Sequence, residues 1–526
     1  MSFPAELLLL ACLLLSILST GLAIVHRFLR MRGLNLIAYG IGAGILIHGL
    51  FGLWIALVAH YHRQIAGILG CLVLIALVYL WKQKVIVDLF RDLAHPIKIF
   101  LGIWIAFVVC CIAITHLQVR WPDTLPDGQF VFKTHTTNVK VQVMTWLPTD
   151  NSIAFMVQEY LLRRIPFEQE RGIIPYLEVT QRTILMPLVG LPFRALLDPP
   201  PRYQKPLPKF HYGSGDWPNT QLLYTESGFR QFLTISIALN ALLLLGAGLF
   251  CANLGMGAAL PLAAFSCATN IYFVSQTIYS WPKAFAGFFV ALAWDAFRRQ
   301  RDPILVGACT ALAYQCHPYA IAFIGGMGVC FLLEPNANTR WRNVIRYSAI
   351  VMLLLLPWFI WTRFIVQIPS TMFSYNFNPG GADAIFPNPI WVRLNNLFRV
   401  FVPTFPTIYP FDFKNVITGI PSSLPGVVGF ILFVPAIVRL LRLDNRILLY
   451  AGICLPAALL VFVFGFPTFP VVLGLQPIIA LLCFFGVAHM RERLRPAIYW
   501  SVIALQLFFN VIVTIANGYL VGAHVA

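Results

Sequence analysis

The chain alternates between long apolar stretches and short polar turns over most of its 526 residues. An apolar run of roughly 17 to 25 residues is long enough to cross the hydrocarbon core of a bilayer as a helix. The sequence therefore predicts an all-α polytopic membrane protein with about 13 to 14 transmembrane helices. The range reflects residues 303–333, because Cys316-His317-Pro318 fits either a break between two spans or a kink within one helix. The spans lie near residues 5–26, 36–59, 65–81, 97–116, 231–253, 257–275, 282–297, 303–317, 319–333, 347–366, 424–441, 447–465, 470–488 and 498–520.

Two long polar segments interrupt these spans and divide the chain. The predicted units are a three-span N-terminal extension (1–96), a transmembrane core (97–366), a second loop (367–423) and C-terminal helices (424–526). The core contains the larger polar segment, residues 117–230. This segment carries half of the acidic residues, namely Asp123, Asp127, Asp150, Glu159, Glu168, Glu170, Glu178, Asp198, Asp216 and Glu226. Carboxylates gathered beside the spans indicate chemistry at a membrane surface.

Composition excludes a soluble protein, since 59% of the residues are hydrophobic and only 11% are charged. The net charge of +17 does not indicate nucleic-acid binding, because the basic residues form short clusters between apolar runs. Basic clusters of this kind mark cytoplasmic loops, and all of them fall on one side if the spans alternate. We therefore expect the N-terminus, both large loops and the C-terminus outside, in a multi-pass protein of a bacterial inner membrane. The clusters are Arg27, Arg30 and Arg32; Lys82, Lys84 and Arg91; Arg298, Arg299 and Arg301; Arg340, Arg342 and Arg346; Arg439, Arg442 and Arg446; and Arg491, Arg493 and Arg495.

The segment 117–230 shows local patterns of its own. Alternation within residues 130–147 predicts a short strand, and Pro148-Thr149-Asp150-Asn151-Ser152 predicts a turn into a helix over 153–162. A second apolar helix is predicted over 179–197. Both helices are too short to span, so we expect them to lie along the outer leaflet as juxtamembrane helices. Thr149, Asp150 or Asn151 fits an N-cap, because each has a side-chain oxygen that can accept hydrogen bonds from the first free amides of the helix.

This order of elements resembles the GT-C superfamily of membrane glycosyltransferases. Those enzymes are similar to this chain in the order of their elements. A first span is followed by an outer loop with a carboxylate just before a juxtamembrane helix, then by a second such helix, and then by many further spans. The resemblance covers residues 97–520, but three spans precede the usual first one, and Asp150-Asn151 stands where an acidic pair is often found. The motifs that carry it are Pro148-Thr149-Asp150-Asn151 with Phe155 to Leu162, then Gln181 to Leu188, Ser280-Trp281-Pro282-Lys283-Ala284-Phe285 and Cys316-His317-Pro318-Tyr319.

The resemblance implies transfer of a sugar from a polyprenyl-phosphate donor to a glycan, lipid or protein acceptor at the outer face. Asp150 would be the general base, with Glu159, Glu168 and Glu170 in reserve, although each of these three also fits a solvated surface carboxylate. The leaving phosphate needs cations. Each cation also fits a residue that snorkels to the membrane interface or anchors there to headgroups. The predicted phosphate ligands are Arg163, Arg164, Arg182, Lys283, His317 and Arg363.

No cofactor follows from the sequence. Some enzymes of this type use a divalent cation, but no spacing of residues here demands a metal, and the eleven cysteines lack the Cys-x-x-Cys pattern of a structural zinc site. No phosphate-binding glycine motif indicates ATP-driven transport by this chain alone.

Other functional classes stay open. A transporter or flippase fits the composition, as does a non-catalytic membrane subunit of an envelope-biogenesis complex. Coupled transporters usually carry ionisable groups in mid-membrane, and the predicted spans almost lack them. His48 is the titratable residue nearest to the middle of a span, and we interpret it as a histidine hydrogen-bonded to a neighbouring helix. We interpret Asp295 as part of a charge cluster with Arg298 and Arg299 at an inner helix end.

Overall fold

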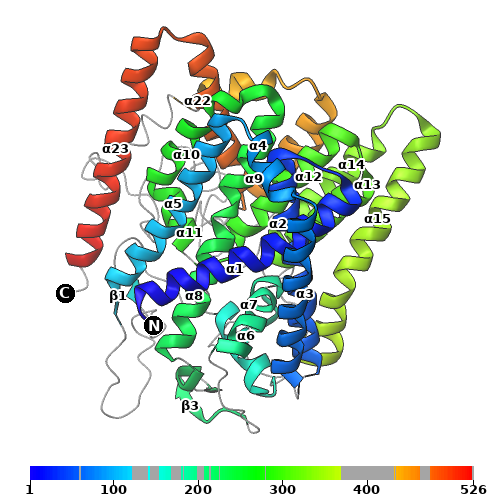
Figure 1. The fold of residues 1–526 in the computed structure, drawn as a ribbon, viewed down its shortest axis with the longest axis vertical. Coiled ribbons are helices and arrows are strands. Elements are labelled where there is room, and N and C mark those ends of the chain that lie inside the picture. Colours follow the sequence, from blue (N-terminus) through cyan, green and yellow to red (C-terminus); the bar gives the residue numbers. More distant parts are fainter. Residues whose placement is uncertain are drawn as a thin grey trace.

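The computed structural model confirms a mainly helical, multi-pass architecture (Figure 1). Within the described residues, six helical stretches are long and apolar enough to cross a membrane by length and composition. They are Phe3–Leu29, Gly33–Leu57, His62–Lys82, His95–Thr115, Ser227–Thr269 and Ala337–Phe364. The structure describes residues 1–58, 61–120, 140–141, 153–167, 179–181, 183–197, 206–212, 215–218, 220–223, 225–278, 280–368, 432, 434–462 and 474–523.

Helices at the N-terminus pack closely through glycine. A Cβ on Gly44 would lie 2.1 Å from the carbonyl oxygen of Ile17, so only glycine lets α1 and α2 approach to this distance. Gly52 does the same between α2 and α7, where a Cβ would lie 1.9 Å from the carbonyl oxygen of Leu188. The predicted three-span extension is thus packed against the middle of the chain. Its elements are α1 (Phe3–Ile24), η1 (Val25–Leu29), α2 (Gly33–Leu57), α3 (His62–Lys82) and α4 (Val85–Asp92).

The segment between α5 (His95–Gln118) and α8 (Glu226–Asn240) contains both predicted short helices, α6 (Ile153–Arg163) and α7 (Leu185–Leu197). The predicted strand is also present as β2 (Lys140–Val141), which pairs antiparallel with β1 (Val119–Arg120). The position of these two helices along the outer leaflet stays a prediction. Every residue of α6 from Ile153 to Arg163 is buried against the rest of the protein. Further elements are η5 (Val179–Gln181), the hairpin β3 (Lys209–Tyr212) and β4 (Gly215–Pro218), and η6 (Thr220–Leu223).

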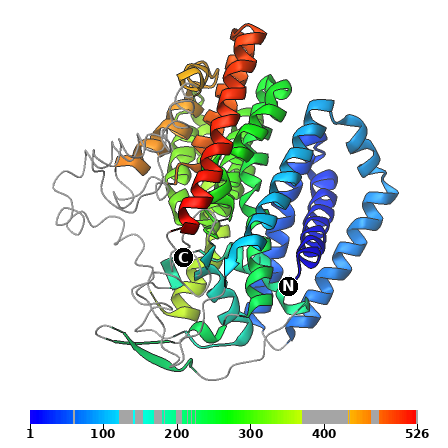
Figure 2. The same cartoon turned by 90° about the vertical axis from the view of Figure 1, so that its left-hand side faces the viewer.

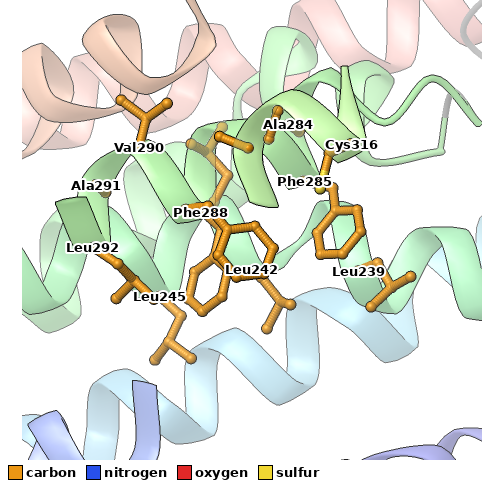
Figure 3. Close-up of a cluster of buried hydrophobic side chains, with 14 of the residues drawn as sticks. Leu239, Leu242, Leu245, Ala284, Phe285, Phe288, Val290, Ala291, Leu292 and Cys316 are labelled. Carbon is orange, nitrogen blue, oxygen red and sulfur yellow. The ribbon is translucent and has the colours of Figure 1, made fainter. Parts of the chain in front are cut away.

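A bundle of apolar helices forms the centre of the molecule. Large aromatic and aliphatic side chains from α8, α9 and α12 interdigitate there, including Leu242, Leu245 and Phe288 (Figure 3). At His317 the backbone is extended, with φ −154° and ψ 133°, so residues 303–333 form two separate helices and not one kinked helix. The helices are α9 (Leu242–Cys251), α10 (Leu260–Thr269), α11 (Ile271–Ile278), α12 (Lys283–Gln300), α13 (Pro303–Cys316), α14 (Ile321–Leu332) and α15 (Ala337–Ile360). Their connections are η7 (Ala252–Met256), η8 (Gly257–Ala259) and η9 (Pro318–Ala320), and η10 (Trp361–Val366) follows α15.

Further helices follow residue 434. They are η11 (Leu448–Cys454), α21 (Leu455–Phe462), α22 (Gln476–Arg493) and α23 (Pro496–Ala523). Half of the predicted span 424–441 lies outside the described residues.

The two ends of the bundle differ in chemistry. At one end, basic residues join turns that are far apart in sequence: Arg298 donates to the carbonyl oxygen of Asn253 (2.8 Å), and Arg299 bonds Asn35. Arg491 bonds the carbonyl oxygen of Ala258 at the same end. The other end carries α6, α7, β3 and the N-terminus (Figures 1 and 2). Two of the six predicted basic clusters, those of Arg298 and Arg491, thus lie at one common end of the folded chain.

Candidate functional site

A buried carboxylate lies at the middle of α6. Both oxygens of Glu159 accept hydrogen bonds from guanidinium groups, one from Arg163 Nε and one from Arg194 Nε, each at 2.8 Å. Arg163 is one helical turn further along α6, whereas Arg194 belongs to α7. None of these three side chains, which we call the Glu159 cluster, is more than 7% exposed.

The Glu159 cluster ties α6 and α7 to the start of α8. Arg163 Nη2 donates to the carbonyl oxygen of Leu223 (3.2 Å) in η6. Arg194 lies so close to α8 that a Cβ on Gly228 would be 2.5 Å from its Nη2 atom. Removing the only acid of the cluster would leave two buried cations without this partner, which is strongly destabilising. The cluster therefore has the arrangement of a structural cross-link.

These contacts correct two expectations. The interpretation of Glu159 as a solvated surface carboxylate is wrong, because its side chain is completely buried. The interpretation of Arg163 as a snorkelling residue is also wrong, since its guanidinium bonds Glu159 and Leu223 inside the protein.

Gln158, next to Glu159, is also fully buried. Neither its Oε1 nor its Nε2 has a hydrogen-bond partner in the structure. A Cβ on Gly190 of α7 would lie 2.4 Å from Gln158 Oε1, so the amide packs directly on the backbone of the neighbouring helix. A buried amide with no partner opposes folding, because it has lost its hydrogen bonds to water.

A second set of buried polar side chains surrounds the start of α12. The Nζ atom of Lys283 lies 4.0 Å from the centre of the Trp281 ring, in a cation–π contact. Tyr319 connects this lysine to His317, because its hydroxyl donates to the carbonyl oxygen of Lys283 (2.8 Å) and its N–H donates to His317 Nδ1 (3.2 Å). These four residues, the Lys283 cluster, are each at most 8% exposed.

Amide side chains from three other helices lie around the Lys283 cluster. Asn240, at the end of α8, accepts a hydrogen bond from the backbone N–H of Phe285 (3.2 Å), in the first turn of α12. Gln476 Nε2 donates to Gln276 Oε1 (3.1 Å), and the neighbouring Gly474 packs so closely on Tyr319 that a Cβ would lie 2.5 Å from its ring. Polar groups from α8, α11 and α22 therefore converge on the lysine end of α12.

Tyr319 links two of the predicted phosphate ligands, because it bonds the backbone carbonyl oxygen of Lys283 at the start of α12 and the ring of His317 after α13. Arg163 belongs to the separate Glu159 cluster. Arg164 is half-buried directly after α6, and Arg363 is exposed on η10, the position expected for an interfacial anchor. The remaining predicted residues lie outside the described residues: Asp150, Arg182, Glu168 and Glu170.

Sequence reasoning missed Arg194 and Tyr319. Arg194 is the single charge in the apolar stretch Leu185–Leu197, and an isolated charge in such a helix indicates a buried partner. Tyr319 stands in the Cys316-His317-Pro318-Tyr319 motif, but nothing in the sequence indicates that its hydroxyl reaches the backbone of α12. Long-range contacts of this kind become visible only in the fold.

The interpretation of His48 is confirmed. The interpretation of Asp295 is confirmed for Arg299, whereas Arg298 bonds the carbonyl oxygen of Asn253. The His48 ring bonds Ser16 Oγ on α1 (2.7 Å) and the carbonyl oxygen of Gly44 (2.8 Å). Asp295 lies 3.6 Å from Arg299 and also accepts hydrogen bonds from Tyr39 (2.9 Å) and Asn253 (2.7 Å). Both residues are held by local partners away from the Lys283 cluster.

Among the described residues, no group of three or more histidine, cysteine, aspartate or glutamate side chains is placed to hold a metal ion. Comparisons of the chain with protein-family models, with curated proteins and with solved structures found no match. The functional assignment therefore depends on the arrangement of residues within this chain.

Proposed function

We propose that the protein is a membrane glycosyltransferase of the GT-C type that uses a polyprenyl-phosphate-linked sugar as donor. The observation that carries the proposal is the convergence of Lys283, His317 and the first turn of α12 in one buried place. An acceptor hydroxyl on a glycan, lipid or protein would receive the sugar at the outer face of the membrane.

The electrostatics of the Lys283 cluster suit a phosphate. Lys283 is the first residue of α12, so its ammonium group lies at the positive end of the helix dipole. A histidine that can supply an N–H donor lies close by. In a buried site these groups act through little water, and each contributes more to binding an anion than it would at the surface.

The chemistry follows from this placement. The acceptor hydroxyl attacks the anomeric carbon of the sugar, the bond from that carbon to the phosphate oxygen breaks, and polyprenyl phosphate leaves with the bonding electron pair. Lys283 and His317 would stabilise the charge that develops on the leaving phosphate. Asp150 would take the acceptor proton, as a carboxylate acting as general base. Glu159 is less suited to this role, since both of its oxygens already bond arginine.

The proposal includes a membrane topology. In it, the 14 spans predicted from the sequence cross a bacterial inner membrane, and α6, α7, β3 and both termini lie on the outer side. The single basic end of the bundle supports this orientation, because basic turns favour the cytoplasm.

Reconstitution into proteoliposomes tests the proposal. The polyprenyl-phosphate sugar is placed in the leaflet that faces the outer end of the protein. The enzyme should release free polyprenyl phosphate in the presence of an acceptor extract. Movement of intact donor to the other leaflet, with no cleavage, would instead identify a flippase.

Thiol labelling tests the orientation separately. The exposed Cys12, Cys71, Cys110 and Cys454 would first be replaced by alanine. A cysteine at Ser214 should then react with a membrane-impermeant reagent from outside, whereas a cysteine at Asn338 should not. The reverse pattern would place the Lys283 cluster on the wrong face for an outer-face transferase.

A further inference from the structure

The basic end of the bundle contains a compact cationic group that the proposed reaction does not use. It lies at the end of the helical residues 434–441 and at the end of α22. The salt bridge from Arg439 Nη1 to Glu492 Oε2 (2.9 Å) fixes these two helix ends together. Figure 2 shows the turn from α22 to α23 at the opposite end of the molecule from β3.

His489 lies inside this group, one residue beyond the predicted span 470–488. Burial lowers the pKa of His489, and the positive charges of Arg442, Arg493 and Arg439 lower it further, while Glu492 opposes the shift. The imidazole of His489 thus experiences the positive charge of three guanidinium groups and the negative charge of one carboxylate. The Nδ1 atom of His489 is buried and has no hydrogen-bond partner, so a donor or acceptor position inside the group is unfilled.

Helix α23 begins at Pro496, three residues after Arg493. The hydroxyl of Tyr499 is buried and has no hydrogen-bond partner, and the positive charge of Arg491 acts on this tyrosine. The adjacent Ile498 and Trp500 expose 51% and 58% of their surface. Exposed tryptophan next to arginine is typical of the depth at which lipid headgroups meet the hydrocarbon.

We propose that Arg439, Arg442, Arg493, His489 and Tyr499 bind the phosphate headgroup of an anionic phospholipid from the cytoplasmic leaflet. Arginine can hold phosphate oxygens with two parallel hydrogen bonds. His489 Nδ1, in the tautomer that carries its proton there, and the Tyr499 hydroxyl supply two further donors. The acyl chains would lie along Ile498 and Trp500. Exposed apolar residues beside the cations favour a lipid over a soluble phosphate, and basic sites between helices on this side of membranes commonly bind such headgroups.

Native mass spectrometry tests the site by measuring which lipid the protein retains. The full-length protein is studied with added phosphatidylglycerol or phosphatidylcholine. The protein should retain phosphatidylglycerol preferentially, and the double variant Arg442→Gln, Arg493→Gln should bind it about tenfold or more weakly, since each arginine near an anionic surface contributes on the order of 1 kcal/mol. The matched control is Arg342→Gln, Arg346→Gln, which removes two exposed arginines of α15 from another basic cluster. If both double variants lost the same affinity for phosphatidylglycerol, the lipid would respond to general surface charge, and the proposal of a defined site would be wrong.

A second measurement needs no substitution. A bound anion offsets the arginine charges, so the pKa of His489, followed by NMR in nanodiscs, should rise when phosphatidylcholine is replaced by phosphatidylglycerol. An unchanged pKa would overturn the proposal. If inorganic phosphate at millimolar concentration raised the pKa equally in phosphatidylcholine, the site would bind soluble phosphate, and the lipid assignment would be wrong.

Discussion

The Glu159 cluster and the Lys283 cluster are both buried polar groups in an apolar protein, but they differ in charge and in the origin of their partners. In the Glu159 cluster two arginines face one carboxylate, and all bonds run between α6, α7 and the entry to α8. In the Lys283 cluster a lysine at a helix N-terminus meets a histidine and a tryptophan face. The first arrangement connects three helices through an acid, whereas the second collects groups that favour an anion.

The difference separates a structural function from a binding function. An acid held by two arginines fixes helix positions, and losing it costs stability more than activity. A cation at the positive end of a helix, with a histidine linked to it through Tyr319, adds positive potential that favours an anionic ligand. Substitutions should therefore affect stability in one cluster and binding in the other.

The largest effect is expected from Glu159→Gln. This change leaves Arg163 and Arg194 buried without their carboxylate, which should lower stability by roughly 3 to 5 kcal/mol and strongly reduce the yield of folded protein in detergent. Asp88→Asn is the control, because Asp88 forms an exposed ion pair with Arg91 and should change stability by less than about 1 kcal/mol. Comparable unfolding temperatures for the two variants would contradict a structural role for Glu159.

Asp150→Asn should remove the proposed base without disturbing the helix cap, since asparagine caps about as well as aspartate. Transfer activity should fall at least about a hundredfold, with little change in the unfolding temperature. Asp150→Ala should lose activity equally and also about 1 kcal/mol of stability. Near-normal turnover by Asp150→Asn would make the carboxylate a cap only, and would transfer the catalytic role to Glu168 or Glu170.

Lys283→Met removes the ammonium group of the second cluster and keeps a long apolar side chain. The affinity for polyprenyl phosphate should fall about tenfold or more, the scale of a charged hydrogen bond. The unfolding temperature should change less than in Glu159→Gln, because the long apolar side chain of methionine keeps the packing against Trp281. Arg363→Met is the matched control, since Arg363 is exposed, and it should bind polyprenyl phosphate normally. If Lys283→Met strongly destabilised the protein but left the affinity for polyprenyl phosphate unchanged, the Lys283 cluster would be structural and not a binding site.

The smallest effect concerns Gln158, which lies beside the Glu159 cluster but makes none of its bonds. Gln158→Met should stabilise the protein by about 1 kcal/mol, because it removes a buried amide that has no partner. The measurement is the unfolding temperature in detergent, compared with Glu159→Gln in the same buffer. A clear loss of stability would show that the amide has a bonded partner, such as an internal water molecule.

Much of the fold follows from the sequence because apolar length and basic turns are local signals. The spans near residues 5–26, 36–59 and 65–81 correspond to α1, α2 and α3. The helix after Pro148 was predictable from its turn and its apolar run, and it is present as α6. Its complete burial was not predictable, since it depends on how α7 and the N-terminal helices pack around it.

The clusters were only partly visible in the sequence. Lys283 and His317 could be selected because each is a polar residue beside a proline at the end of an apolar run. The link through Tyr319 could not be predicted, because a hydrogen bond from a hydroxyl to a backbone carbonyl 36 positions away leaves no local pattern in the sequence. Glu159 was misjudged for the same reason, because its second partner, Arg194, is 35 positions away on another helix.

A density map of the protein with added polyprenyl phosphate tests the central claim most directly. The account predicts a phosphate bound between Lys283 and His317, with Asp150 within roughly 15 Å of both, close enough to share one headgroup. A polyprenyl phosphate found only at the basic end of the bundle, or a Lys283 cluster closed off from Asp150, would contradict it.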